Sequence, residues 1–449
     1  MDEQNVAVEE ALSEQEIAKE TKVQPGGDNL PLHWLKVDLG DLLEQGKLTI
    51  TNGFAQGGYN ESGQGVPHLR PFNVTEDGFI DLSQIKSVEP PRETSPYWVH
   101  PGDVIFNNTN SEELVGKTAY FALSGKFVLS NHMTLIRILD SQTLDALWFA
   151  NEFQYLWRRR VFQALCRRHV NQASISLERL KGIIIPLPPF FEQRTIAHAL
   201  RTVQEAIQTR RREADLERER KAALMQHLFT YGTRGEPTKQ TEIGEKPESW
   251  RVVPLGQVAK ITSGGTPDRT KPEYWNGDIP WVKTGEIDYK IITTAEEYIT
   301  RAGLANSSAK ITPAGTLLMA MYGQGVTRGR VAILGIDAAL NQACAAITLM
   351  GGMVTDFVFY FLTHNYESIR NLGHGANQKN LNALLIKAIL VACPHSNEQQ
   401  EIATTLRACD NKITALEQEI KLLEELFRAL LEELMTGQLS VAPLVVAHE

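Results

Sequence analysis

Cysteine is scarce in this sequence, and its placement argues against two classes of protein. Four cysteines stand singly among 449 residues, at Cys166, Cys344, Cys393 and Cys409. None has the C-x2-C spacing of a zinc site, and four scattered cysteines lack the density of a disulfide-stabilised scaffold. We therefore expect all four to be small buried hydrophobic residues.

Long apolar runs are also missing. Runs such as residues 383–393 are far shorter than the ~20 residues that a membrane-spanning helix needs, and Lys387 interrupts this one. The chain starts with an acidic stretch instead of the basic and apolar segments of a secretory signal. We expect a cytoplasmic protein without membrane contact, and an apolar content of 42% is sufficient for a sizeable core.

An overall basic surplus is missing as well. The net charge of -9 argues at first against nucleic acid, because phosphate binding depends on Lys and Arg. The charge is segregated, however. Residues 157–235 carry sixteen basic and seven acidic residues, whereas residues 1–20 carry seven acidic residues and one lysine. Phosphate contact and acidic partner surfaces can therefore coexist, although complementary helices would show the same segregation.

What the sequence does contain is an internal repeat. Ordered matches extend over most of the chain, which indicates a tandem duplication. The matched positions are Trp34 and Trp250, Gly40 and Gly256, Pro67 and Pro280, residues 102–106 and 315–319, Gly116 and Gly329, Asn131 and Asn341, Asn171 and Asn377, Pro188 and Pro394, and Glu192 and Glu398.

Each copy divides into two parts. The first part has short β-like runs separated by Gly, Pro and Asn turns, which indicates a compact mixed domain. The second is one helix of about 40 residues, or about 60 Å. It begins after a Pro, has Glu-Gln in its first turn, and stops at Gly232 or Gly437. The predicted segments are an acidic extension (1–29), a first domain (30–190), a central helix (191–231), a linker (232–249), a second domain (250–396), a C-terminal helix (397–437) and a tail (438–449).

Apolar residues alternate in steps of four and three along both predicted helices, as in the seam of a coiled coil. The first seam has a polar middle, and its apolar members are Ile196, Leu200, Val203, Ile207, Leu224 and Leu228. The second seam is unbroken, and we list Ile402, Leu406, Ile413, Leu416, Ile420, Leu423, Phe427, Leu430 and Leu434. We predict an α+β fold of two mixed α/β domains separated by two long antiparallel coiled-coil helices, with pseudo-two-fold symmetry. Paired readers related by such symmetry bind DNA half-sites roughly 34 Å or more apart.

Four segments carry a resemblance to a known family. They are IPLPPFFEQRTIAHAL (185–200), GDVIFNNTNSEELVGKTAYF (102–121), GTRGEPTKQTEIGEKPESW (232–250) and GTLLMAMYGQGVTRGRVAIL (315–334). In this domain-helix-domain-helix order they closely resemble the specificity subunit of type I restriction-modification enzymes, from about residue 30 to 440. The acidic extension and the tail lie outside the strong motifs.

The resemblance implies two target-recognition domains that bind a bipartite double-stranded DNA sequence with a non-specific gap. It implies that the chain has no catalysis and no cofactor of its own. It implies docking of two modification subunits, which use S-adenosylmethionine, and of restriction subunits, which use ATP and Mg²⁺.

Two motifs of enzymes are present only in part. Gly116-Lys117-Thr118 matches the end of a phosphate-binding P-loop, but Ser111 stands where that motif needs Gly. Residues 187–190 match an amino-methyltransferase motif that holds a target base, but Leu187 replaces its Asn or Asp. Because both motifs are incomplete, they argue against catalysis within this chain.

Candidate DNA contacts are donors in matching places of the two copies or in polar loops. Arg and Lys contact phosphates and guanine, and Asn and Gln can read adenine. Turn formation or a solvated face explains many of these residues as well. The candidates are Arg70, Asn73, Asn107, Asn108, Asn110, Lys117, Arg158, Arg168, Lys283, Gln324, Thr327, Arg328, Arg330 and Lys379. We place Arg158 and Arg168 on one probable helix.

Two other functions stay open at this point. The chain could be a nuclease or methyltransferase that carries its own recognition domain, and methyl transfer by the purified chain would establish that. It could also be a structural coiled-coil scaffold, which the absence of salt-sensitive, sequence-selective DNA binding by its complex would favour.

Overall fold

The computed structural model describes residues 30–54, 60, 64–323, 326–372 and 380–441. The chain divides into two compact units: unit 1 comprises Met1–Arg210 and Glu419–Glu449, and unit 2 comprises Arg211–Gln418. Each long helix thus contributes to both units. The division predicted from the sequence treats each long helix as a segment separate from the two domains. The structure divides the chain differently because the helices bury apolar side chains in the cores of the units.

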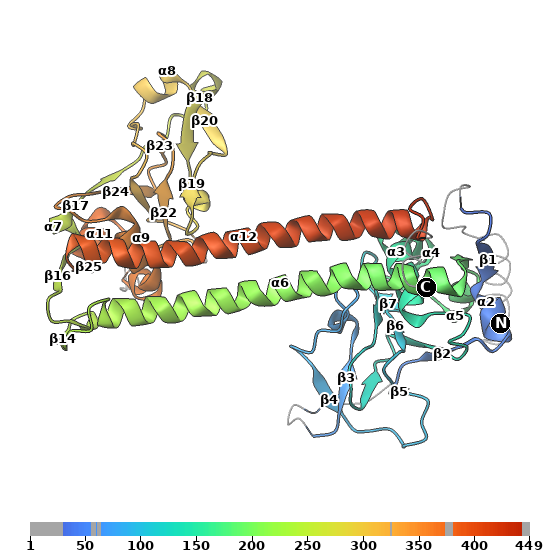
Figure 1. Cartoon of the computed structure of the whole chain (residues 1–449). Coiled ribbons are helices and arrows are strands. Elements are labelled where there is room, and N and C mark those ends of the chain that lie inside the picture. Colours follow the sequence, from blue (N-terminus) through green and yellow to red (C-terminus); the bar gives the residue numbers. More distant parts are fainter. Residues whose placement is uncertain (1–29, 55–59, 61–63, 324–325, 373–379, 442–449) are drawn as a thin grey trace, which may run out of the picture. The chain divides into compact units, whose positions relative to one another are not determined.

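Unit 1 is a mixed domain of short strands and helices (Figure 1). Its strands are β1 (Leu35–Asp38), β2 (Leu48–Asn52), β3 (Val66–Leu69), β4 (Lys86–Val88), β5 (Trp98–Val99), β6 (Val104–Phe106), β7 (Thr109–Asn110), β8 (Thr118–Tyr120), β9 (Phe127–Leu129), β10 (Thr134–Ile138), β11 (Arg167–Arg168), β12 (Ala173–Ser174) and β13 (Ile184–Leu187). Its helices are α2 (Leu39–Glu44), the 3-10 turn η1 (Pro71–Asn73), α3 (Ala146–Arg158), α4 (Val161–Leu165), α5 (Leu177–Lys181) and the first half of α6 (Phe190–Tyr231).

Unit 2 repeats this pattern. Its strands are β14 (Thr238–Thr241), β15 (Gly244–Pro247), β16 (Arg251–Pro254), β17 (Ala259–Ser263), β18 (Trp275–Val282), β19 (Ile291–Ile292), β20 (Glu297–Ile299), β21 (Leu317–Ala320), β22 (Val331–Leu334), β23 (Ala339–Leu340), β24 (Cys344–Leu349) and β25 (Leu390–Cys393). Its helices are α7 (Leu255–Val258), η2 (Pro272–Tyr274), η3 (Thr284–Glu286), α8 (Arg301–Ala305), α9 (Thr355–His364), α10 (Tyr366–Asn371), α11 (Ala383–Ala388) and most of α12 (Ser396–Met435).

The sheet topology confirms the duplication. The order β2-β10-β6-β8 in unit 1 matches β17-β24-β21-β22 in unit 2, and β1-β13 matches β16-β25. In a further pair of sheets, β3 lies parallel to β9 as β18 lies parallel to β23. The predicted α+β fold of two mixed domains is therefore correct.

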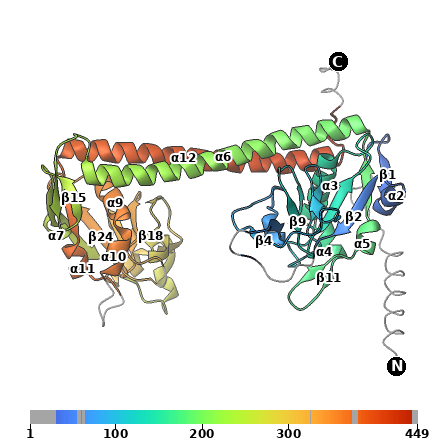
Figure 2. The same ribbon diagram turned by 90° about the horizontal axis from the view of Figure 1, so that it is seen from below.

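The core of each unit joins a sheet, a domain helix and both long helices. In unit 1, α3 packs on β6 and β8, and Figure 2 shows it close to the long helices. Phe106 makes edge contacts with Phe153 and Phe162, with ring centres 5.7 and 5.0 Å apart. Ile196 of α6 and Phe427 of α12 belong to the same cluster. Burial of one such side chain stabilises the folded unit by about 1.5–3 kcal/mol. The long helices are therefore structural parts of each unit.

The ends of the long helices follow their sequence signals. α6 ends at Tyr231 and α12 at Met435, and the glycines close behind them, Gly232 and Gly437, have φ angles of 65° and 68°. This left-handed conformation favours glycine and lets a helix end in a tight turn. The seam residues are buried or half-buried throughout both helices.

Charged residues account for the polar middle of the first seam. In unit 2, the Glu217 carboxylate is 4% exposed and lies 3.2 Å from Nζ of Lys412. Lys221 pairs with Asp410, whose other oxygen accepts a 2.6 Å hydrogen bond from Tyr360 of α9. Because residue numbers rise on α6 while they fall on α12, these pairs show that the two helices run antiparallel in this unit.

Candidate nucleic-acid interface

A small sheet in unit 1 brings two predicted contact residues together. Asn110 of β7 lies opposite Ala173 of β12, and Ala173 lies opposite Arg168 of β11. Asn110 is half-buried and Arg168 is exposed. The sheet therefore combines an amide and a guanidinium group that stand far apart in the sequence.

The hairpin that joins β11 to β12 exposes its tip. The backbone N–H of His169 donates to the carbonyl of Gln172 over 2.7 Å and closes a tight turn. Val170 at the tip is 98% exposed, and Asn171 and Gln172 are exposed beside it. The major groove of B-DNA admits a two-stranded β-ribbon, and Asn and Gln are bidentate readers of adenine. We call residues 167–174 the basic hairpin.

An ion pair restrains Arg168 without burying it. Its Nη2 lies 2.7 Å from a carboxylate oxygen of Glu112. An exposed pair of this kind contributes only about 0–1 kcal/mol, so Arg168 can exchange the carboxylate for a phosphate at little cost.

The prediction of one helix from Arg158 to Arg168 is wrong. α3 ends at Arg158, and Arg160 adopts a left-handed conformation with a φ of 60° and a ψ of 21°. α4 follows, and Cys166 is extended, so that Arg168 lies in a strand. Cys166 is also only half-buried, unlike the other three cysteines.

Three predicted contact residues lie inside the domain. Asn107 is fully buried, and its amide donates to the Pro71 carbonyl over 2.9 Å. Asn108 is 8% exposed and bonds Thr134. Lys117 is 6% exposed, and burial lowers the pKa of its ammonium group, which donates to the backbone of unit 1. The prediction of DNA contact is therefore corrected for these residues: they hold the loops around β7.

Arg70 with Asn73, and Lys283 with Glu286, hold matching places because each pair closes a 3-10 turn. The N–H of Arg70 donates to Asn73 over 2.9 Å, and the N–H of Lys283 donates to Glu286 over 2.8 Å. Asn73 is 1% exposed, so its predicted role as a contact is corrected too. Arg70 stacks on exposed Phe72, and Lys283 forms ion pairs with two glutamates that raise its pKa.

The loop of unit 2 that contains Arg328 and Arg330 is partly held by contacts within the domain. Arg328 is 7% exposed, and Arg330 forms a 2.6 Å ion pair with Asp288. Thr327 is half-buried. Gln324 and Lys379 lie outside the part of the chain that the structure describes. Of the four placed candidates in this unit, Lys283, Thr327 and Arg330 therefore keep partly accessible side chains.

Two pairs of hydrogen bonds position the domains on the helices, and neither was predicted from the sequence. The indole of Trp34 donates to Glu192 and that of Trp250 to Glu398, both over 3.0 Å. The neighbouring glutamine of each helix bonds the carbonyl of the preceding proline over 2.9 Å. The repeated Glu-Gln and Trp were visible in the sequence, but nothing there indicated that they meet.

Among the described residues, no group of three or more His, Cys, Asp or Glu side chains could hold a metal ion. In the same stretches, no helix is long and apolar enough to span a membrane.

Comparison with protein families gives one match that covers most of the chain. The family described as "Type I restriction modification DNA specificity domain" matches twice, at residues 31–218 and 247–425. The two matches coincide with the two copies of the internal repeat.

Individual relatives agree with this match. A Methanocaldococcus jannaschii protein, provisionally named as the specificity subunit of type I restriction enzyme MjaX, is 27% identical over 418 residues, which cover 92% of this chain and 95% of the relative. The MjaIX specificity subunit of the same organism is 30% identical over 193 residues, 42% of this chain and 44% of the relative. The crystal structure of the S subunit of a type I system from M. genitalium has a TM-score of 0.59 at 15% identity, covering 92% of this chain and 98% of that chain, which supports the fold.

Proposed function

Because this chain belongs to the family of type I restriction-modification DNA specificity proteins, we propose that it is the subunit that reads a bipartite duplex target, one half with each mixed domain. The observation that carries the proposal is the duplication itself. The two domains share strand order and helix links but carry different side chains at matching places, such as Arg70 against Lys283, which are both partly accessible. Such a pair of readers fits two different half-sites.

The long helices support a second part of the proposal, which is that they set the distance between the half-sites. Both helices are built into both units, and their buried seam and ion pairs resist sliding. A stiff antiparallel pair fixes a separation better than a flexible linker does.

We further propose that the chain is non-catalytic and docks methyltransferase and restriction subunits. S-adenosylmethionine and ATP with Mg²⁺ would then be bound by those partners. Two observations argue against nucleotide binding at the partial P-loop of this chain. Lys117 of the partial P-loop is buried, and Gly116 of the same motif packs against Phe162, so this motif serves the core.

The test is to co-express the chain with its methyltransferase subunit and to map methylated adenines across genomic DNA. We expect a split motif with two defined halves and a gap of fixed length. Exchange of residues 30–190 for the matching domain of a relative should change one half only. A contiguous motif, or methylation by the purified chain alone, would contradict the proposal.

Removal of seven residues from each long helix should shorten the gap. Residues 208–214 and 415–421 face one another across the pair formed by Arg210 and Glu419. Seven residues keep the seam in register and shorten the spacer by about 10 Å, or about three base pairs. The methylation map should show both halves unchanged and the gap shorter by about that amount. An unchanged gap would mean that the helices do not set the spacing.

The basic hairpin should determine affinity for one half-site. We expect Arg168→Ala to weaken binding of target DNA about three- to tenfold, and Asn171→Ala to weaken discrimination at one base of the first half by about 1–3 kcal/mol. Fluorescence anisotropy with single-base variants of the target would measure both. Lys181→Ala, which removes a partly exposed cation paired with Glu178, is the control.

A further inference from the structure

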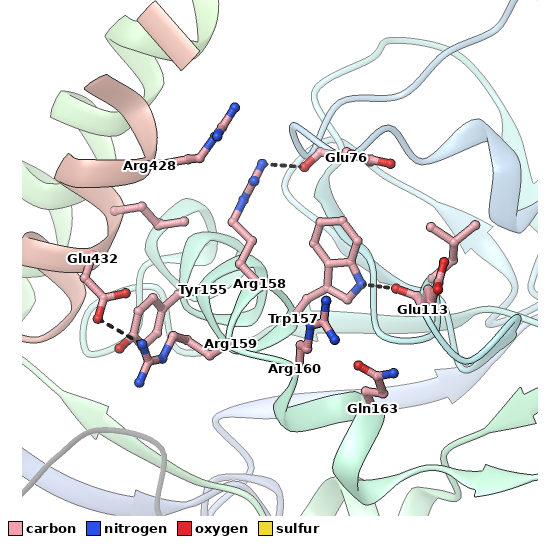
Figure 3. A pocket seen from close by; sticks show the side chains of 12 residues that line it. Glu76, Glu113, Tyr155, Trp157, Arg158, Arg159, Arg160, Gln163, Arg428 and Glu432 are labelled. Carbon is pink, nitrogen blue, oxygen red and sulfur yellow. Dashed lines mark hydrogen bonds and ion pairs between the residues drawn. The ribbon is translucent and has the colours of Figure 1, made fainter. Parts of the chain in front are cut away.

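A pocket of about 540 Å³ lies in unit 1 beside the last turns of α12 (Figure 3). The end of α3, the start of α4, Glu76 and Glu113 form its other walls. Four arginines line it, namely Arg158, Arg159, Arg160 and Arg428.

Arg158 forms the floor of the pocket and holds a buried donor. Its Nη2 donates to the Glu76 carbonyl over 2.8 Å, and its guanidinium lies 5.7 Å from the ring centres of both Trp157 and Phe427. Its Nε–H is buried and has no hydrogen-bond partner within the described stretches. Burial is the largest cause that lowers the pKa of this guanidinium; Asp77, 3.8 Å from Nη2, opposes the shift, and Arg428 adds to it.

Arg160 extends the positive surface from a strained position. Its φ of 60° is uncommon for a residue other than glycine, asparagine or aspartate. Its side chain is exposed, and no hydrogen bond or ion pair with another described residue engages it. The chain therefore holds this guanidinium in solvent without an internal use.

Carboxylates at 3.5–3.8 Å offset three of the four arginines of the pocket. Glu432 lies 3.5 Å from Arg159 and offsets that one charge. Glu76 and Glu113 accept hydrogen bonds from Arg158 and Trp157 with their backbone carbonyls, so the main chain holds these walls. Asp77 lies 3.8 Å from Arg158, and Glu424 lies 3.8 Å from Arg428. Arg160 is thus the arginine of the pocket without a carboxylate partner among the described residues, and the long pairs of the other three contribute little, so that a phosphate can replace these carboxylates.

We propose that this pocket binds phosphate groups of the DNA backbone, an inference that rests on the proposed function. One carboxylate connects the pocket with the basic hairpin: Glu112 accepts from Arg168 over 2.7 Å and from Gln163, a pocket residue, over 3.0 Å. Guanidinium groups bind phosphate oxygens with paired hydrogen bonds, and such contacts position a protein on the duplex without reading sequence. The pocket thus acts on every duplex alike and fixes the register of the hairpin.

The test uses the assembled complex with the methyltransferase subunit and the variants Arg160→Gln, Arg428→Gln and their combination. Affinity is measured between 50 and 200 mM salt for a duplex with the mapped target and for a scrambled duplex. We expect each variant to weaken the binding of both duplexes by the same factor, about three- to tenfold. The slope of log affinity against log salt concentration should fall by about 0.9 per lost contact. Arg194→Gln removes an exposed charge of the same unit outside the pocket and should change neither quantity.

The outcomes separate the pocket from the proposed function. Unchanged affinity and salt slope in the double variant would overturn the phosphate site. Loss of methyltransferase assembly with unchanged DNA affinity would overturn it in favour of an acidic protein partner. A wild-type complex that does not distinguish the target from the scrambled duplex would contradict the proposed function itself. A melting temperature equal to that of the wild type shows that the variants are folded.

Discussion

Replacement of Glu152 by glutamine is expected to stabilise unit 1 by about 3 kcal/mol at pH 7. Glu152 lies on α3 and is fully buried, and neither of its carboxylate oxygens has a hydrogen-bond partner in the described part of the chain. Burial raises the pKa of this carboxyl from 4.5 to about 8. The folded protein must therefore keep a proton that the unfolded chain releases.

The sign of the pH dependence follows from that difference. Because the pKa is higher in the folded state, the stability associated with Glu152 is fully present below pH 4.5. It is lost as the pH rises to about 8, by about 1.4 kcal/mol per pH unit. The Glu152→Gln variant lacks this loss, since glutamine has a similar shape and no charge to bury.

Thermal unfolding of both proteins between pH 5 and pH 8 measures the effect. The variant should melt roughly 5–10 °C above the wild type at pH 7, and the difference should shrink towards pH 5. Glu44→Gln, at an exposed position of the same unit, is the control and should stay within about 0.5 kcal/mol of the wild type. A difference in melting temperature that stays constant across the pH range would show that the folded protein stabilises the buried negative charge of Glu152.

Replacement of Glu398 by alanine should destabilise unit 2 by about 3 kcal/mol, whereas Glu192→Ala should cost unit 1 only about 1 kcal/mol. The two residues hold matching places, and both accept a bond from a tryptophan indole. Their burial differs. The Glu398 side chain is 1% exposed and also accepts from the N–H of Thr233, whereas the Glu192 side chain is 21% exposed and has His33 as its second partner.

The difference in cost follows from solvation. Removal of Glu398 leaves buried N–H donors without an acceptor, while water can replace Glu192. Limited proteolysis and hydrogen exchange would localise each effect to its unit, since a chain of two units need not unfold in one step. Equal losses of stability would mean that the site of Glu398 in unit 2 is as accessible to water as the site of Glu192 in unit 1. Glu398→Gln should recover part of the loss by accepting the indole bond.

Most of the architecture could be predicted because the repeat and the seam depend on local patterns. Gly232 and Gly437 marked the helix ends, and steps of four and three marked the buried face of α12. The division into units could not be predicted in this way. It depends on contacts between distant segments, such as Ile196 and Phe427, which no periodicity records.

The candidate site was harder to predict, because residue type does not determine exposure. Asn107, Asn108 and Lys117 have donors suited to DNA, yet the fold uses those donors to satisfy backbone carbonyls and a threonine hydroxyl. Arg168 and Asn110 were found individually, but their meeting in one sheet depends on strand pairing. The left-handed Arg160 carried no signal, since arginine rarely adopts that conformation.

The division of the chain into units also determines the order in which they can fold during synthesis. Unit 2 is one continuous stretch, so its contacts can form once Gln418 has left the ribosome. Unit 1 is translated first, but its core includes Phe427, Leu434 and Met435 at the far end of α12. The first domain to be made is therefore the last to be completed, and its unfinished apolar face must be kept from aggregating until then.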